Sequence, residues 1–422
     1  MKFYGRMLLA AICAAALLLA GCLPERAEPE GSDTAIGVSQ VRQLAAADNT
    51  AGRTLMWTGS RDSEYAVEVR REGEWGTRSF KAENVSFKDG KYEYIQYKAA
   101  LSGLEPGTDY RYRVVRGGAC GRWHSLRTDG GGAFKALIFP DSQSSNYSGW
   151  TELARGAWER NKDAALYVNM GDLVDNGQDY YQWQQWLGSV EPFSGDIPLA
   201  PVIGNHETYS LEWQIRMPDA YTGLFSLPGN GMEKYRNQFY SFDYGPVHFT
   251  VIDTNFDDEL IPFEPQLAED QKRWLEQDLA SAAAKWKVVL QHRDIVLYGF
   301  GPKSGRPQTG TYFIETGLQL MPIYEKYDVD AVLSAHLHTY RRRVPLRGFA
   351  PAEDGITYIL TGVAGSVRYP NLWGEWEWDA ARAPQPETAN YMTMEADGEK
   401  LVFKAFLPDG RQFDETVIRK RV

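Results

Sequence analysis

Five short apolar runs, each followed at once by a side chain that can hold a metal ion, limit the folds open to this chain of 422 residues. The runs cover residues 134–139, 164–170, 199–203, 286–291 and 329–334. Short, continuous apolar runs are typical of strands that are buried on both faces of an α/β sheet. The carboxyl ends of such strands meet at one crevice, so the side chains that follow them can share a site.

The side chains that follow the runs suit divalent metal ions, which bind carboxylate, amide and imidazole groups. They are Asp141, Asp172, Asn205, His292, and His336 with His338. The chain has six histidines, and only His124 and His248 lie away from these strand ends. His248 falls inside a strand predicted at 246–253, so we expect it to be a packed side chain. A single His-X-His pair is weak evidence for a metal site, but five ligand-bearing segments in a fixed order are strong evidence for one.

Residues 129–422 are predicted to form an α/β domain, because helical patterns alternate with the apolar runs. The helical patterns cover 150–160, 266–284 and 318–327, and further strands are expected at 356–361, 391–394 and 401–406. Before the glycines at 130–132 the pattern changes to β-rich runs at 54–58, 65–70, 92–99 and 110–115. Turn residues separate these runs, so residues 40–128 are expected to form an all-β sandwich.

Residues 1–21 have the pattern of a signal peptide. Lys2 and Arg6 precede an apolar stretch at 7–20 that is short for a membrane span. The sequence Leu-Ala-Gly-Cys that ends at Cys22 resembles a bacterial lipobox, which implies cleavage before Cys22 and lipid attachment to it. An ordinary signal peptide and an uncleaved anchor are the alternatives. We expect an extracytoplasmic, lipid-anchored protein with a flexible tether over 22–39.

Cysteine usage and net charge limit the disulfides and the binding partners that this chain can have. Once the leader is lost and Cys22 is acylated, only Cys120 would remain free, so no intramolecular disulfide is expected. The formal net charge of −11 at pH 7 argues against a nucleic-acid-binding surface. An anionic substrate would therefore need a local source of positive charge, which bound metal can supply.

The order of the motifs resembles that of the calcineurin-like metallophosphoesterases. The motifs are Asp141-Ser142-Gln143, Gly171-Asp172, Gly204-Asn205-His206-Glu207, His292 and Ala335-His336-Leu337-His338. In the β-rich part, residues 104–114 resemble the strand-entry corner of fibronectin type III domains, and Trp57 is placed like their early core tryptophan. Over residues 40–422 the chain resembles bacterial relatives of purple acid phosphatases. This implies a fibronectin-like sandwich, expected only to position or space the second domain, and then a four-layer sandwich of helices flanking two packed mixed sheets.

The resemblance also implies a site for two divalent ions drawn from Mn, Fe, Zn, Ca and Mg. Asp172 would bridge the ions. One ion would be completed by Asp141 and His338, and the other by Asn205, His292 and His336. Gln143 stands where many members have a metal-binding histidine, and whether it coordinates is left open. An amide oxygen is a harder, weaker donor than imidazole, so this ion would bind loosely or favour Mn, Mg or Ca over Zn.

The implied chemistry is hydrolysis of a phosphate ester, with water activated between the ions attacking phosphorus. His206 would face the substrate and stabilise the transferring oxygens or protonate the leaving group, and Glu207 would orient it. Purple acid phosphatases carry a tyrosine three residues after the bridging aspartate, and its bond to ferric iron gives the colour. Asp175 occupies that position here, which predicts a colourless enzyme.

The roles of several further residues are left open by the sequence. Arg341, Arg342 and Arg343 would either guide phosphate to the cleft or form a solvated charged run. Arg293 and Tyr298 are candidate substrate contacts because they lie near His292 in the chain. Tryptophans that either rim the pocket or pack elsewhere are Trp183, Trp186, Trp373 and Trp376.

These observations predict a phosphomonoesterase that releases inorganic phosphate from small organic phosphates outside the cytoplasm. A phosphodiesterase or nucleotidase is the alternative among enzymes. The alternative outside enzymes is a surface binding module with a degenerate metal cleft. The expected partners are a small phosphate ester and, through the lipid anchor only, a membrane; the sequence predicts no oligomeric state.

Overall fold

The computed structural model describes residues 31–296, 313–369 and 377–420. The chain divides into two units, Met1–Glu30 and Gly31–Val422, and only the second is described. The expected signal peptide, the lipid attachment site Cys22, and Tyr298, Trp373 and Trp376 lie outside the described residues. Within them, no helix is long and apolar enough to cross a membrane.

The prediction of a flexible tether over 22–39 is wrong for residues 33–39, which lie in the described part of the chain. A 3-10 turn spans Thr34–Ile36, and the side chains of Ile36 and Val38 are buried in the core of the β-rich part. The Asp33 carboxylate also accepts a hydrogen bond from the backbone N–H of Arg122 and lies 3.1 Å from His124 Nε2. Two apolar side chains and one acid are enough to fix this segment, although its composition is that of a linker.

Residues 39–127 form two facing sheets. Part of the larger sheet consists of β1 (Ser39–Leu44), β2 (Arg53–Thr58), β8 (Gln96–Leu101) and β5 (Glu83–Asn84). The second sheet contains β10 (Ala119–Cys120), β9 (Asp109–Arg116), β3 (Ala66–Arg71) and β4 (Thr77–Lys81), with β11 (His124–Arg127) beside β9. Side chains alternate along these strands, so Tyr112 and Val114 of β9 face the core while Arg111 faces solvent. Trp57 is fully buried there, stacked on Tyr97, as expected.

A ten-stranded sheet joins this β-rich part to the rest of the chain. Its order is β26-β25-β24-β12-β13-β14-β1-β2-β8-β5. The strands not yet introduced are β12 (Phe134–Phe139), β13 (Leu166–Asn169), β14 (Pro198–Pro201), β24 (Tyr391–Ala396), β25 (Lys400–Phe406) and β26 (Gln412–Arg419). Strands β12, β13, β14 and β1 run parallel, so Gln43 and Leu44 of β1 continue a parallel sheet.

A seven-stranded sheet packs against the ten-stranded one. Its strands in order are β15 (Tyr240–Tyr244), β16 (Val247–Ile252), β17 (Trp286–Gln291), β18 (Ala331–Ser334), β22 (Thr357–Thr361), β19 (Tyr340–Arg343) and β23 (Asp379–Arg382). Strands β16, β17, β18 and β22 are parallel. Two small hairpins complete the strands: β6 (Phe87–Asp89) with β7 (Tyr92–Tyr94), and β20 (Leu346–Arg347) with β21 (Ala350–Pro351).

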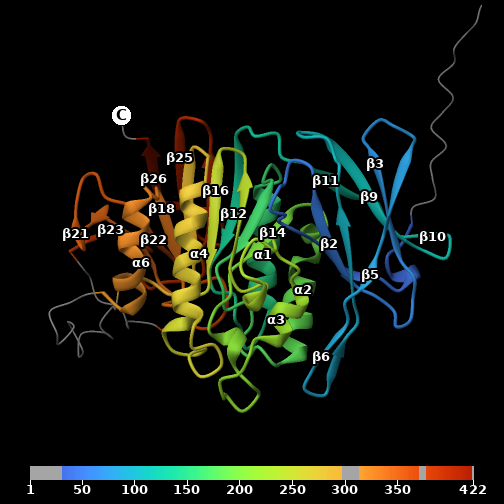
Figure 1. Cartoon of the computed structure of the whole chain (residues 1–422), viewed down its shortest axis with the longest axis horizontal. Coiled ribbons are helices and arrows are strands. Elements are labelled where there is room, and N and C mark those ends of the chain that lie inside the picture. The colour runs from blue at the N-terminus through green and yellow to red at the C-terminus, as the bar shows by residue number, and fades with distance from the viewer. Residues whose placement is uncertain (1–30, 297–312, 370–376, 421–422) are drawn as a thin grey trace, which may run out of the picture. The chain divides into compact units, whose positions relative to one another are not determined.

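Helices cover the outer faces of both sheets (Figure 1). Val288 and Leu290 of β17 lie in the core shared by the two sheets, whereas Val289 points the other way and packs with helix residues such as Leu275. Helices α4 (Leu267–Ser281) and α6 (Glu315–Lys326) cover that outer face. Helices α1 (Ser148–Arg160) and α2 (Tyr180–Ser194) pack against β12 and β1, and α3 (Asp219–Leu224) is short. The predicted fold class is confirmed.

Two expectations about elements and side chains need correction. Helix α2 is absent from the sequence prediction. Its Trp183 and Trp186 are core residues, which is the packing alternative left open for them. Arg341 and Arg343 are buried in β19, so the arginine run is neither solvated nor a phosphate guide. Arg343 pairs with Asp294 and Arg342 with Asp414, partners that lie far away in the sequence.

Candidate metal centre

The strand-end residues converge as the sequence predicts. One group that could hold a metal ion consists of Asp141, Asp172 and His338, and a second consists of Asp172, His292 and His336. Within each group one ligand atom per residue lies within 4.8 Å of the others. Asp172 belongs to both groups, so a single carboxylate links two neighbouring sites.

In the first group Asp141, two residues after the end of β12, faces the imidazole of His338, which follows β18. Asp141 Oδ2 lies 3.0 Å from His338 Nε2, and Asp141 Oδ1 accepts a hydrogen bond from the backbone N–H of His336. His338 Nδ1 lies 3.1 Å from the carbonyl oxygen of Val367, which leaves Nε2 turned to the site. The Gln143 side-chain amide also enters this group, with its Nε2 2.8 Å from His338 Nε2.

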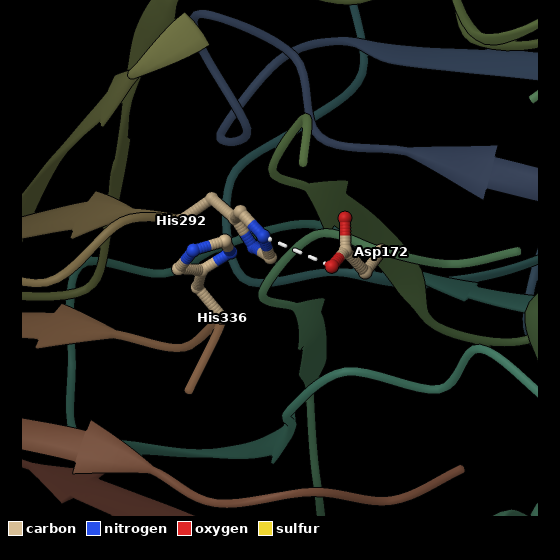
Figure 2. A group of neighbouring side chains, drawn as sticks. All are labelled: Asp172, His292 and His336. Atoms are coloured by element: carbon tan, nitrogen blue, oxygen red, sulfur yellow. Dashed lines mark ion pairs between the residues drawn. The ribbon is translucent and has the colours of Figure 1, made fainter. Parts of the chain in front are cut away.

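In the second group His292, from the end of β17, lies between Asp172 and Asn205. Its Nε2 is 3.1 Å from Asp172 Oδ2 (Figure 2) and also 3.1 Å from Asn205 Oδ1. His292 Nδ1 lies 2.9 Å from the carbonyl oxygen of Met170, which fixes the ring in the same way as at His338. His336 Nδ1 is 2.9 Å from Asn205 Oδ1, so the amide oxygen lies between two imidazoles.

The backbone at three of these residues adopts the left-handed region, which side chains other than glycine rarely occupy. The φ angles are +47° at Asp172, +72° at His336 and +50° at His338. Such conformations cost free energy and persist where the surroundings determine them strongly. Three of the ligand-capable side chains are therefore held in place at a cost in backbone conformation.

Glu207 supports this backbone, which corrects its expected role. Its carboxylate accepts hydrogen bonds from the backbone N–H groups of Asp172, Leu173 and Gly204, at 3.0, 2.8 and 2.8 Å. Burial and then Asp172 raise the pKa of Glu207 to about 7. The contact to His206 is made by Asp175 instead: His206 Nδ1 lies 2.7 Å from the carbonyl oxygen of Asp175 and 3.6 Å from its carboxylate.

The electrostatics of the centre come from opposite charges held close together in a buried place. Burial would raise the pKa of Asp172, but His292, His206 and His336 outweigh burial and hold it well below its ordinary value. Burial likewise lowers the pKa of His292, yet Asp172 raises it to about 9. The site therefore stabilises a carboxylate beside a positive charge, which a bound cation also supplies.

The donor set fits divalent ions. Among the described residues, the buried Gln143 Oε1 has no hydrogen-bond partner, and the buried Asp141 Oδ2 has only its ion pair with His338 Nε2 at 3.0 Å. Buried acceptors without partners are costly, and a cation at this place would satisfy them. Two carboxylates, three imidazoles and amide oxygens are also the mixture that divalent metals accept. The clusters are thus candidate sites for divalent metal ions.

Aromatic side chains at the edge of the centre could not be identified from the sequence motifs. Tyr209 and Trp213 lie 5.3 and 6.0 Å from the His206 ring, and Tyr369 lies 4.9 Å from the His338 ring, between centroids. Trp213 follows the Gly-Asn-His-Glu motif by six residues, and this short distance in the chain was the one sign in the sequence that Trp213 could lie near the site. Among the other candidates, Arg293 pairs with the buried Glu259, and His248 is a packed residue as expected.

Comparisons with known proteins agree with this geometry. Residues 38–128 match the model of the purple acid phosphatase N-terminal domain. Acid phosphatase type 7 of Mus musculus is 27% identical over 360 residues, which cover 76% of this chain and 78% of the relative. A relative named probable inactive purple acid phosphatase 27, from Arabidopsis thaliana, is 24% identical over 68% of this chain and 44% of its own length.

The fold is also similar to solved structures. A purple acid phosphatase from yellow lupin (Lupinus luteus) seeds superposes with a TM-score of 0.77 and 18% identity, over 91% of this chain and 74% of that one. PhoD superposes with a TM-score of 0.59 and 13% identity, over 90% and 88%. Residues 123–340 match the model of the calcineurin-like phosphoesterases, a match that extends over more than half of the chain. The chain therefore belongs to the calcineurin-like phosphoesterases, as a purple-acid-phosphatase-like phosphoric ester hydrolase.

Proposed function

We propose that the protein is a phosphomonoesterase that uses two divalent ions to release inorganic phosphate from small organic phosphates. The observation that carries this proposal is that Asp172 is shared by the two ligand groups. The ions would be held by Asp141, Gln143 and His338 on one side of Asp172, and by Asn205, His292 and His336 on the other. When bound, they supply Lewis-acid charge and activate water.

The reaction adds water across the ester bond. A new P–O bond forms to the water oxygen, the bond from phosphorus to the leaving oxygen breaks, and the alcohol departs with a proton. His206 is the side chain available to donate that proton, because Nδ1 is held by Asp175 and Nε2 is left to face the substrate. Asp175 fills the place of the iron-binding tyrosine, so the pure protein should lack an intense visible band.

The test is hydrolysis of aryl phosphate mono- and diesters by the mature protein, before and after chelation. Activity should disappear on chelation and return with added Mn, Mg or Zn, and the monoester should be preferred; preference for the diester would favour a phosphodiesterase.

Asp172→Ala should lower kcat by about a thousandfold or more with the fold retained. Asp163→Ala, which removes an exposed carboxylate paired with Lys135, is the matched control and should keep full activity. Full metal occupancy without turnover of any ester would favour a binding module with a degenerate cleft.

We also propose that the protein acts outside the cytoplasm, held at a membrane by lipid on Cys22. The support is the Leu-Ala-Gly-Cys sequence after a short apolar stretch. The mass of the N-terminal peptide of the mature protein tests this, because an unmodified Met1 or an unacylated Cys22 would contradict it.

A further inference from the structure

Trp213 is a large apolar side chain that the fold leaves open to solvent beside the metal centre. It is 55% exposed, and its ring lies at right angles to the His206 ring at 6.0 Å. The Tyr209 ring lies near both, with its centroid 5.3 Å from that of His206 and 5.8 Å from that of Trp213. The proton-donating side chain of the proposed reaction is therefore bordered by an aromatic surface.

The chain adopts an unfavourable conformation to present this side chain. Trp213 has a φ of +60°, a region that bulky residues rarely adopt. The loop is closed by hydrogen bonds from Trp213 N–H to Ser210 O at 2.9 Å and from Ser210 N–H to Gln214 O at 2.8 Å. An exposed indole gains little from burial, so packing within this chain does not account for a strained backbone here.

A second exposed aromatic residue borders the other ligand group. Tyr369 is 44% exposed, and its ring lies 4.9 Å from the His338 ring with an angle of 33° between their planes. An exposed aromatic side chain thus lies beside each of two histidines of the site, Trp213 beside His206 and Tyr369 beside His338.

We infer that Trp213 is a specificity-determining residue that stacks on a planar ring in the leaving group, so that the preferred substrates are phosphate monoesters of ring-bearing alcohols. This inference rests on the proposed phosphomonoesterase function. The leaving oxygen must approach His206 to receive its proton, so a ring attached near that oxygen comes within reach of the indole. Stacking of a ring on an exposed aromatic side chain is tolerant of the ring's identity.

The experiment compares two esters whose alcohols have similar acidity, 2-phenylethyl phosphate and butyl phosphate. The measured quantity is the ratio of kcat/KM for the first ester over the second. Wild-type protein should favour the ring ester, and Trp213→Ala should lower the ratio by about tenfold, the order expected for one aromatic stack. Trp213→Phe keeps a planar ring and should retain most of the ratio, whereas Trp213→Leu keeps apolar bulk alone and should lose it.

Trp75→Ala is the matched control, because Trp75 is 70% exposed in the β3–β4 turn and is not next to either described ligand group in the chain. It should leave both esters unaffected. A ratio that Trp213→Ala and Trp213→Leu leave unchanged, with both esters still hydrolysed, overturns the role of Trp213 but not the phosphatase. If metal-loaded wild-type protein hydrolyses neither ester, the proposed function fails and this inference fails with it.

Discussion

Glycine has a steric role at two positions of the metal centre. A Cβ atom on Gly204 would overlap Asp172 Oδ1 and the backbone nitrogen of Asp172, and one on Gly171 would overlap His292 Nδ1. The Gly-Asp and Gly-Asn pairs of the sequence therefore bring two loops close enough for the ligands to meet. Motif spacing singled out the Asp and His side chains that the structure brings together in two groups. It assigned Glu207 the wrong contact, because the hydrogen bonds of a carboxylate depend on how two distant loops pack.

Gly204→Ala should impair the metal centre while the rest of the fold remains intact. The added methyl group must displace the Asp172 carboxylate, so we expect metal affinity to fall by about ten- to a hundredfold, and activity with it. Metal content after dialysis, together with kcat, measures this. Gly188→Ala in helix α2 is the matched control: its Cβ meets no atom within 4 Å, so it should stabilise the helix slightly and leave metal content unchanged. Equal metal content in both variants would disprove the steric argument.

At the scale of elements, the β6–β7 hairpin supports the loop that carries Trp213. Arg216, at the end of that loop, pairs with the buried Asp89 of β6 at 2.7 Å and with Asp219 at 2.7 Å. The side chain of Gln178, three residues after Asp175, also accepts a hydrogen bond from the backbone N–H of Leu211. The β-rich part, which was expected only to position or space the second domain, thus contacts a loop beside the metal centre.

Continuous apolar runs were enough to predict β12 and β17, because burial on both faces leaves a clear signal in the sequence. The arginine run in β19 was misjudged for the opposite reason. Its burial depends on Asp294 and Asp414, whose positions only the folded chain reveals. Helix α2 was missed because its aromatic and glutamine-rich sequence and internal Pro192 obscure the helical period.

Asp89→Asn should weaken turnover without emptying the metal centre. The variant removes the charge that holds Arg216, so the loop with Trp213 and His206 should shift and kcat/KM should fall by about three- to tenfold. Separate measurement of kcat, KM and metal content distinguishes displacement of the loop from loss of metal. Glu93→Gln in the same hairpin removes an exposed ion pair with Arg61 and should have no effect. Similar losses in both variants would mean that the hairpin acts through general stability alone.

For the molecule as a whole, the two predicted domains share a sheet. Strand β1 of the β-rich part pairs with β14 beside the metal centre, and Arg42 reaches the carbonyl oxygen of Leu224. The sequence change at the glycines 130–132 marks a change of architecture. The sequence could not show that β1, which precedes these glycines, joins the sheet of the domain that follows them. Pairing between parallel strands far apart in the chain leaves no local pattern.

Stability should depend on pH through His248, which ties three elements together. Its Nδ1 lies 2.7 Å from Asp243 of β15, and its Nε2 lies 3.0 Å from Asp278 of α4, which also accepts a hydrogen bond from Thr250. Burial lowers the pKa of His248, but the hydrogen bonds to Asp243 and Asp278 outweigh it and raise the pKa to about 9. A pKa raised by folding stabilises the protein fully below the unfolded value, near 6.5, and this contribution disappears as the pH rises through about 9.

His248→Gln should therefore lower the free energy of unfolding by about 2 kcal/mol at pH 6, a figure reduced from the full linkage value because Asp243 is largely exposed. The loss should shrink markedly at pH 10, where the wild-type imidazole is neutral. Urea unfolding of both proteins at the two pH values measures the difference. A loss of the same size at pH 6 and pH 10 would show that His248 contributes through packing and not through its charge.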